Sequence, residues 1–114
     1  MTEKTHKPLL VDSVKAAVDI EKFRFIGFDG NYCSANAKAL GISDVETEQG
    51  QYAPVALNGI LLVAAAGSIT VGSKVASSDG GYAITYTTGE FNGYALDASP
   101  GGGLVKIIRI AKGI

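Results

Sequence analysis

Apolar and charged residues are distributed unevenly along the chain, and one long stretch carries almost no charge. Residues 49–78 contain a single charged side chain, Lys74. At the usual share of about a quarter charged residues, a stretch of this length would hold about seven or eight. Such a segment is expected to be buried, either by the rest of its own chain or by another chain.

The alternation of apolar residues over positions 22–28 predicts a strand. Asp29-Gly30 follows it and predicts a type I′ hairpin turn, in which both central residues need positive φ. A two-residue turn would bring Ile26 opposite Cys33 and place that thiol on an apolar face.

Further strands are predicted at intervals of about eight to twelve residues, with turn residues between them. Asn58-Gly59 and Asp79-Gly80 predict tight turns, and the second would set Val75 opposite Ile84. The alanine-rich residues 35–42 have helical propensity, but the short length and Gly41 favour an extended segment. The strands are expected at residues 51–57, 60–64, 74–78, 81–87, 90–96 and 104–110. The spacing predicts an all-β fold, a small β-barrel or sandwich built from short antiparallel strands and hairpins.

The chain before Phe23 lacks this regular pattern. We expect residues 1–22 to form an extended N-terminal arm with a connecting segment, and residues 23–114 to form a single β domain. Residues 2–7 contain no core-forming side chain, whereas residues 9–11 are apolar. One interpretation is an arm that is mobile until a partner buries residues 9–11. The other is that these residues form the first strand of the domain's own sheet.

Composition favours self-association. Charged residues make up only 18% of the chain, and the mean hydropathy of +0.21 is high for a small domain with much surface per residue. We therefore predict a homo-oligomer. The predicted subunit interface comes from the uncharged stretch: Tyr52, Val55, Leu57, Ile60, Leu62, Ile69 and Val71.

The charge pattern argues against several partners. The net charge is −1, with acids and bases interspersed, so no basic nucleic-acid patch and no polybasic membrane anchor is expected. Cys33 is the single cysteine, which excludes an internal disulfide and suits a reducing compartment.

Candidate chemistry is sparse. His6 and Cys33 are the residue types of a base and a nucleophile, but His6 falls on the predicted arm and Cys33 on a strand. The acidic residues 44, 46 and 48 lack the further ligands of a calcium loop. The glycines of residues 99–103 precede a strand, whereas a phosphate loop precedes a helix. Lys74 does not sit at a hairpin tip, where a lipoyl-type lysine would lie. We expect no enzyme activity, no metal, no cofactor and no small-molecule substrate.

A succession of short motifs extends from about Phe23 to Ile110. None is specific alone, and the order and spacing carry the comparison. In chain order they are an F-x-F-I strand with Asp29-Gly30; Ala39-Leu40-Gly41-Ile42; Gly50 before a Val-Ala-Leu strand; Asn58-Gly59-Ile60; residues 66–75; Asp79-Gly80; Gly93-Tyr94-Ala95-Leu96; and Val105-Lys106-Ile107. In this succession the chain resembles the bacteriophage capsid cement, or head decoration, proteins.

The resemblance implies a small β-rich protein without catalytic activity. It further implies a homo-oligomer, a trimer by preference, that binds the major capsid protein on the outside of the virion after synthesis in the bacterial cytoplasm. The N-terminal arm has no counterpart in the recognised pattern, and its composition makes it the candidate capsid-binding segment. The residues are Lys4, His6, Lys7, Pro8, Leu9, Leu10 and Val11.

An alternative reading remains open. Residues 67–75 also resemble part of the β-clip domains, which would make the protein a small ligand-binding or enzyme-accessory module. Such a module needs a concave site with convergent polar groups. No such cluster is evident from the sequence.

Overall fold

The structure, a computed structural model, describes residues 7–109. These residues form eight strands in one antiparallel sheet and no helix. The neighbours along the sheet are β2-β3-β4-β8-β7-β5-β6, and β1 pairs with β4 alongside this path. The strands are β1 (Lys7–Lys15), β2 (Phe25–Ile26), β3 (Gly41–Ser43), β4 (Tyr52–Ala64), β5 (Lys74–Ser77), β6 (Ala83–Thr85), β7 (Gly93–Ala95) and β8 (Leu104–Arg109).

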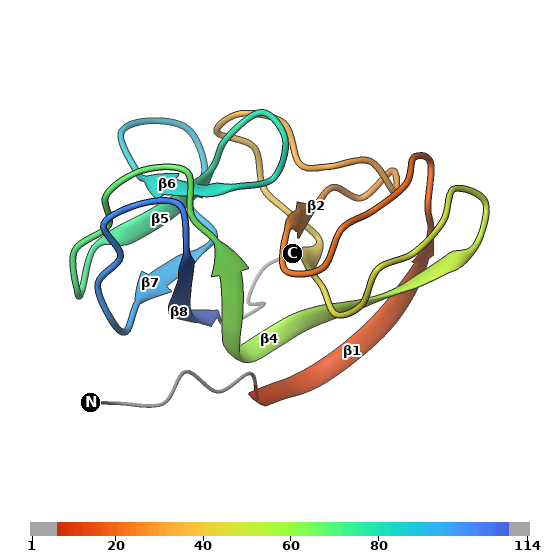
Figure 1. Cartoon of the computed structure of the whole chain (residues 1–114), viewed down its shortest axis with the longest axis horizontal. Coiled ribbons are helices and arrows are strands. Elements are labelled where there is room, and N and C mark those ends of the chain that lie inside the picture. The colour runs from red at the N-terminus through yellow and green to blue at the C-terminus, as the bar shows by residue number, and fades with distance from the viewer. Residues whose placement is uncertain (1–6, 110–114) are drawn as a thin grey trace.

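The two ends of this sheet curl round to meet each other (Figure 1). The Phe25 N–H of β2 donates to the Gly81 carbonyl just before β6, at 2.8 Å, and Ala65 bridges Ala83. Closure of this kind satisfies strand edges that would otherwise be unpaired. The predicted fold class, a small all-β barrel, is confirmed.

Strand β4 is the long, bent element that joins the parts of the barrel (Figure 1). Tyr52–Ile60 pairs with β1, and Gly59–Ala64 pairs with β8. The two predicted strands 51–57 and 60–64 are therefore halves of one strand. The predicted turn at Asn58-Gly59 is wrong, because both residues lie within β4 and have ladder partners on β1, and Gly59 also pairs with Arg109 of β8. The positive φ of Gly59, 119°, falls at an irregularity of the strand and not at a hairpin.

The core has two parts. The barrel interior is filled by a large cluster that includes the fully buried Phe25, Leu61, Val63 and Ile107. A second, smaller cluster lies beneath the segment that follows β1. Its buried members are Ala16, Ile20, Ile26, Ala53 and Val55. Much of the uncharged stretch is thus buried by its own chain.

Strand β1 corrects the expected arm from Lys7 onward. It pairs with β4 along its whole length, from Lys7 opposite Ile60 to Lys15 opposite Tyr52. The physical reason lies at its C-terminal end, where Ala16 and Ile20 are anchored in the second core cluster. The structure therefore favours the interpretation in which residues 9–11 belong to the domain's own sheet. Lys4 and His6 lie outside the described residues.

The first predicted hairpin is longer than expected. Gly30 has φ of 86°, but Asp29 is not among the residues with positive φ, so the turn is not type I′. The Gly30 N–H donates to the Gly27 carbonyl, and Ile26 bridges Tyr32 in place of Cys33. Cys33 is nevertheless buried, on the apolar surface expected for it.

The hairpin of β5 and β6 shows the same correction. Gly80 and Gly81 both have positive φ, and Asp79 does not. The extra residue shifts the register by one, so that Ala76 opposes Ile84 and Val75 opposes Thr85. Gly81 follows the predicted turn pair Asp79-Gly80 and permits the longer loop, because glycine adopts positive φ at little cost.

Candidate functional site

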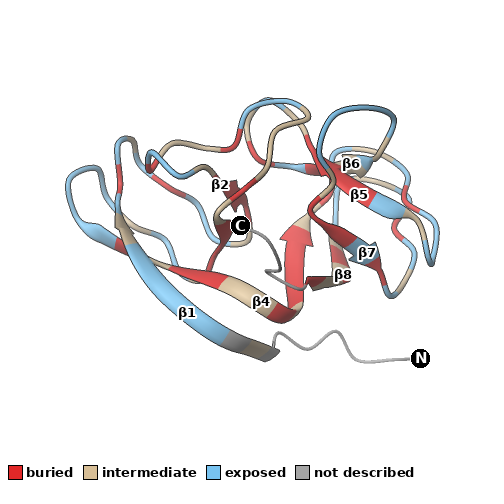
Figure 2. Ribbon diagram, turned by 180° about the vertical axis from the view of Figure 1, so that it is seen from behind, coloured by how far each residue is buried: buried red, intermediate tan, exposed pale blue. Residues whose placement is uncertain are grey.

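The exposed apolar side chains of β1 form the first candidate surface. Among residues 7–109, β1 pairs only with β4, so its outer edge is open. Figure 2 shows β1 as an exposed band across the outside of the molecule. Leu10 and Val11 are 51% and 44% exposed. An open strand edge with apolar side chains is a place where another chain can pair.

Leu10 and Val11 are consecutive residues, and both are exposed because β1 pairs irregularly with β4 at this point. The register shifts between Pro8 and Leu10 and again between Leu10 and Val11, so that Leu10 opposes Asn58 and Val11 opposes Ala56. Such irregularities disturb the alternation of a regular strand and re-aim side chains. Together with Pro8, they limit indiscriminate pairing of β1 with other strands.

A row of side chains on the outside of the barrel forms the second candidate surface. Ile60 of β4 opposes Ile108 of β8, Ile108 opposes Tyr94 of β7, and Tyr94 opposes Lys74 of β5. Directly opposed residues of antiparallel strands share one face. Their neighbours Leu61, Val75, Ala95 and Ile107 are buried in the barrel, so this row faces outward.

The row ends in a cluster of rings and lysines. The Phe91 ring lies edge-on to Tyr86 and to Tyr94, with centroids 6.0 and 5.3 Å away. Lys74 Nζ lies 4.8 Å from the Phe91 centroid, and Lys38 Nζ lies 5.7 Å from it. Edge-to-face rings and ammonium groups over ring faces attract each other, so the cluster is preorganised. We call these five residues the aromatic–lysine patch.

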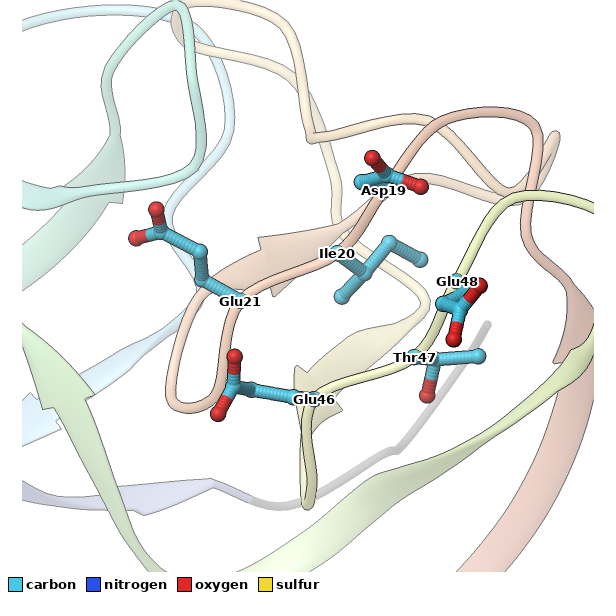
Figure 3. Close-up of a pocket in the computed structure, with 6 residues that line it drawn as sticks. All are labelled: Asp19, Ile20, Glu21, Glu46, Thr47 and Glu48. Carbon is cyan, nitrogen blue, oxygen red and sulfur yellow. The ribbon is translucent and has the colours of Figure 1, made fainter.

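The third candidate surface is an acidic cleft of about 490 Å³ between two loops. Its wall is held by the pairing of Ile20 with Thr47. Four carboxylates surround this pair, as Figure 3 shows, and we call them the acidic rim: Asp19, Glu21, Glu46 and Glu48.

Glu21 lies beside a buried arginine. Its Oε1 accepts a hydrogen bond from Arg24 Nη1 at 2.7 Å, within an ion pair. The Arg24 guanidinium is stacked between the rings of Tyr32 and Tyr82 and donates to the Gly80 carbonyl. Arg24 is buried by these contacts, and its charge-assisted bond orients the Glu21 carboxylate, whose side chain stays 70% exposed.

The predicted interface residues separate into three groups. Val55, Leu62 and Ile69 are buried in the chain's own core, which corrects their prediction, because a second copy cannot reach them. Leu57 and Ile60 are half-buried. Tyr52 and Val71 are 68% and 60% exposed and remain candidates.

Nucleophilic chemistry gains no support from Cys33. Its Sγ lies within the core, 3.4 Å from the Ala37 carbonyl, and burial raises the pKa of the thiol. A buried thiol with a raised pKa carries little thiolate at neutral pH and is a poor nucleophile.

Within residues 7–109, no group of three or more His, Cys, Asp or Glu side chains is placed to hold a metal ion. None of these residues belongs to a helix long and apolar enough to span a membrane.

Comparison with known families decides what kind of protein this is. The profile of the phage cement protein family matches residues 4–110. The chain belongs to this family. The match includes the N-terminal segment, for which the sequence had shown no family pattern, as well as the barrel. The cement protein is therefore a structural protein of the phage capsid.

The fold agrees with a solved structure. The base of the head fiber protein gp8.5 of bacteriophage phi29 superposes with a TM-score of 0.76, at 16% sequence identity. The similarity covers 90% of the cement protein and 94% of the head fiber chain. At this identity the likeness establishes a common fold. No curated protein sequence matches the cement protein.

Proposed function

We propose that this cement protein binds the outer surface of the phage capsid as a homo-oligomer, a trimer by preference, and stabilises the shell. Family membership carries the proposal. The similarity to a phage head fiber base supports it, because that protein's name places it on a phage head. The cement protein acts through binding and not through catalysis.

Strand β1 is the proposed contact with the major capsid protein. Its open edge offers backbone N–H and C=O groups to a strand or extended segment of the capsid. Leu10 and Val11 are about half exposed, so burying the remaining apolar area would be worth about 1 kcal/mol for each side chain. Lys4 and His6, at the beginning of the same segment, belong to the proposed contact as well.

Oligomerisation would strengthen this contact. A short segment binds weakly by itself, but several copies on one oligomer engage a repeated lattice at high effective concentration. The exposed Tyr52 and Val71 and the half-buried Leu57 and Ile60 are the proposed self-association residues.

Changing Leu10→Asp and Val11→Asp together should weaken capsid binding at least about tenfold. The lost apolar burial exceeds about 1.4 kcal/mol, the free energy that corresponds to a tenfold change in affinity. Both side chains are exposed, so the fold should be retained. Co-sedimentation with undecorated heads of the cognate phage measures binding, and circular dichroism checks the fold.

Phe28→Asp is the matched control, because Phe28 is a similarly exposed apolar residue in the loop between β2 and β3, outside the proposed contact surfaces. It should bind like the wild type. A folded Leu10→Asp, Val11→Asp variant that decorates heads normally would contradict β1 as the contact.

A further inference from the structure

We propose that the aromatic–lysine patch of one copy docks on the acidic rim of a second copy, in a head-to-tail contact. The inference rests on the proposed homo-oligomer and names the surfaces that form it. The patch consists of Lys38, Lys74, Tyr86, Phe91 and Tyr94, and the rim of Asp19, Glu21, Glu46 and Glu48.

The patch has the composition of a binding hot spot. Tyrosine and other aromatic residues dominate the energetics of protein interfaces. The Phe91 ring already contacts Tyr86 and Tyr94, and Lys74 Nζ lies over both Phe91 and Tyr86. Little conformational entropy remains to be lost when a partner covers these side chains. Tyr94 is 43% exposed, so it offers substantial area to that partner.

The acidic rim supplies charge complementary to Lys74, since Lys38 Nζ already lies 3.6 Å from the Glu90 carboxylate. Glu46 and Glu48 are exposed on the connection between β3 and β4, and Asp19 is exposed across the cleft (Figure 3). An ammonium group such as Lys74 Nζ, brought against these carboxylates, would form ion pairs that fix orientation and exclude wrong partners. We favour a second copy as the partner of the patch, because every copy of this chain carries the acidic rim that complements Lys74.

Apolar residues extend both surfaces. The patch continues along the outer row through Ile108 to Ile60. The loop with Glu46 and Glu48 leads into Tyr52, whose side chain is largely exposed. Each side of the contact thus combines charge with apolar area.

The two surfaces belong to different parts of the molecule. Figures 1 and 2 agree in placing β5, β6 and β7 on one side of the barrel and the start of β4 on the other. The loop with Glu46 and Glu48 leads into the start of β4, so the proposed contact is made between two copies. Contacts between unlike surfaces are heterologous, and when the rotation closes they form rings such as trimers.

Charge reversal of either surface tests the contact. Lys74→Glu alters the patch, and Glu46→Lys with Glu48→Lys alters the rim. Sedimentation velocity at micromolar concentration should show at least about tenfold weaker self-association for each folded variant. Asp79→Lys, an exposed charge change in the β5–β6 loop, is the control and should assemble like the wild type.

One chain that carries all three reversals, Lys74→Glu, Glu46→Lys and Glu48→Lys, is the sharper test. Its reversed patch complements the reversed rim of the next copy in a ring of any number, so this variant should regain the mass of the wild-type assembly. Separate variants that assemble as well as the wild type, or a combined variant that stays dissociated, would overturn this contact. A wild-type protein that is monomeric at all concentrations would instead overturn the proposed homo-oligomer.

Discussion

Replacement of Arg109 by methionine should lower the free energy of unfolding by about 3 kcal/mol or more. Arg109 lies near the end of β8, and its side chain is buried. Its guanidinium donates to the Leu40 carbonyl at 2.8 Å, to the Leu57 carbonyl at 3.0 Å and to the Ala39 carbonyl. It therefore joins β8 to β4 and to the segment before β3.

The size of the effect follows from what the substitution leaves behind. A buried acceptor without its donor costs about 1–3 kcal/mol, and three carbonyls lose theirs. Methionine fills volume but donates nothing. When both partners of a buried ion pair are side chains, apolar residues can replace the whole pair without loss of stability. The three acceptors of Arg109 are backbone carbonyls, which no substitution can remove.

Burial also lowers the pKa of Arg109 to about 10, so the guanidinium stays charged at neutral pH. A folded-state pKa below the ordinary value means that burial of this cation costs stability at every pH below about 10, and that this cost falls as pH rises further. The hydrogen bonds to the three carbonyls must offset the cost.

Urea unfolding at neutral pH measures the prediction. Arg109→Lys is the matched variant: it keeps the charge but loses the planar fork, so its stability should fall between wild type and Arg109→Met. Equal stability of wild type and Arg109→Met would show that the three carbonyls do not depend on this side chain.

Gly30→Ala should destabilise the protein far more than Gly72→Ala, although both glycines have nearly the same positive φ, 86° and 84°. A Cβ on Gly30 would lie 2.0 Å from the Lys15 carbonyl oxygen at the end of β1, whereas one on Gly72 meets nothing within 4 Å. The Gly30 carbonyl also accepts the Ala17 N–H. The substitution would therefore push β1 and the following segment away from the second core cluster.

The φ cost alone, about 1–2 kcal/mol, applies to both variants. Overpacking adds about 1–3 kcal/mol for Gly30→Ala only. Thermal unfolding of the two variants in parallel gives the difference directly. If the two variants melt together, the close approach of Gly30 to β1 is not present in solution.

Hydrophobic alternation predicted the barrel well, because the residues that line it are strand-forming and recur at short intervals. Residues 104–110 and 90–96 contain β8 and β7, and the alanine-rich residues 35–42 are not helical. The errors lie where tertiary pairing outweighed local preference. Asn58-Gly59 favours a turn in isolation, but ladders on both sides keep it within β4.

Strand β1 shows a similar limit. Its polar residues suggested an arm, and only the second core cluster, built from Ala16, Ile20 and Ile26, explains why the segment is held. The cluster joins residues whose proximity depends on the whole fold. The longer hairpins also could not be read from Asp-Gly pairs, since Gly81 supplies the positive φ that lengthens the second loop.

The candidate surfaces were even less accessible to sequence reasoning. The uncharged stretch indicated an interface, but most of it fills the barrel, and the exposed part reduces to residues such as Tyr52 and Val71. The aromatic–lysine patch gathers side chains from four separate segments, in a region with more charge. The register of β5, β7 and β8 is what brings its Lys74 and Tyr94 into one row with Ile108 and Ile60.

Cryo-electron microscopy of cognate phage heads saturated with the purified protein tests whether it decorates the capsid. We expect density at a repeated position on the outside of the shell. It should fit a symmetric oligomer of this barrel, with β1 toward the major capsid protein. Density confined to the inside of the shell, or heads that remain bare at saturating protein, would contradict the proposed function.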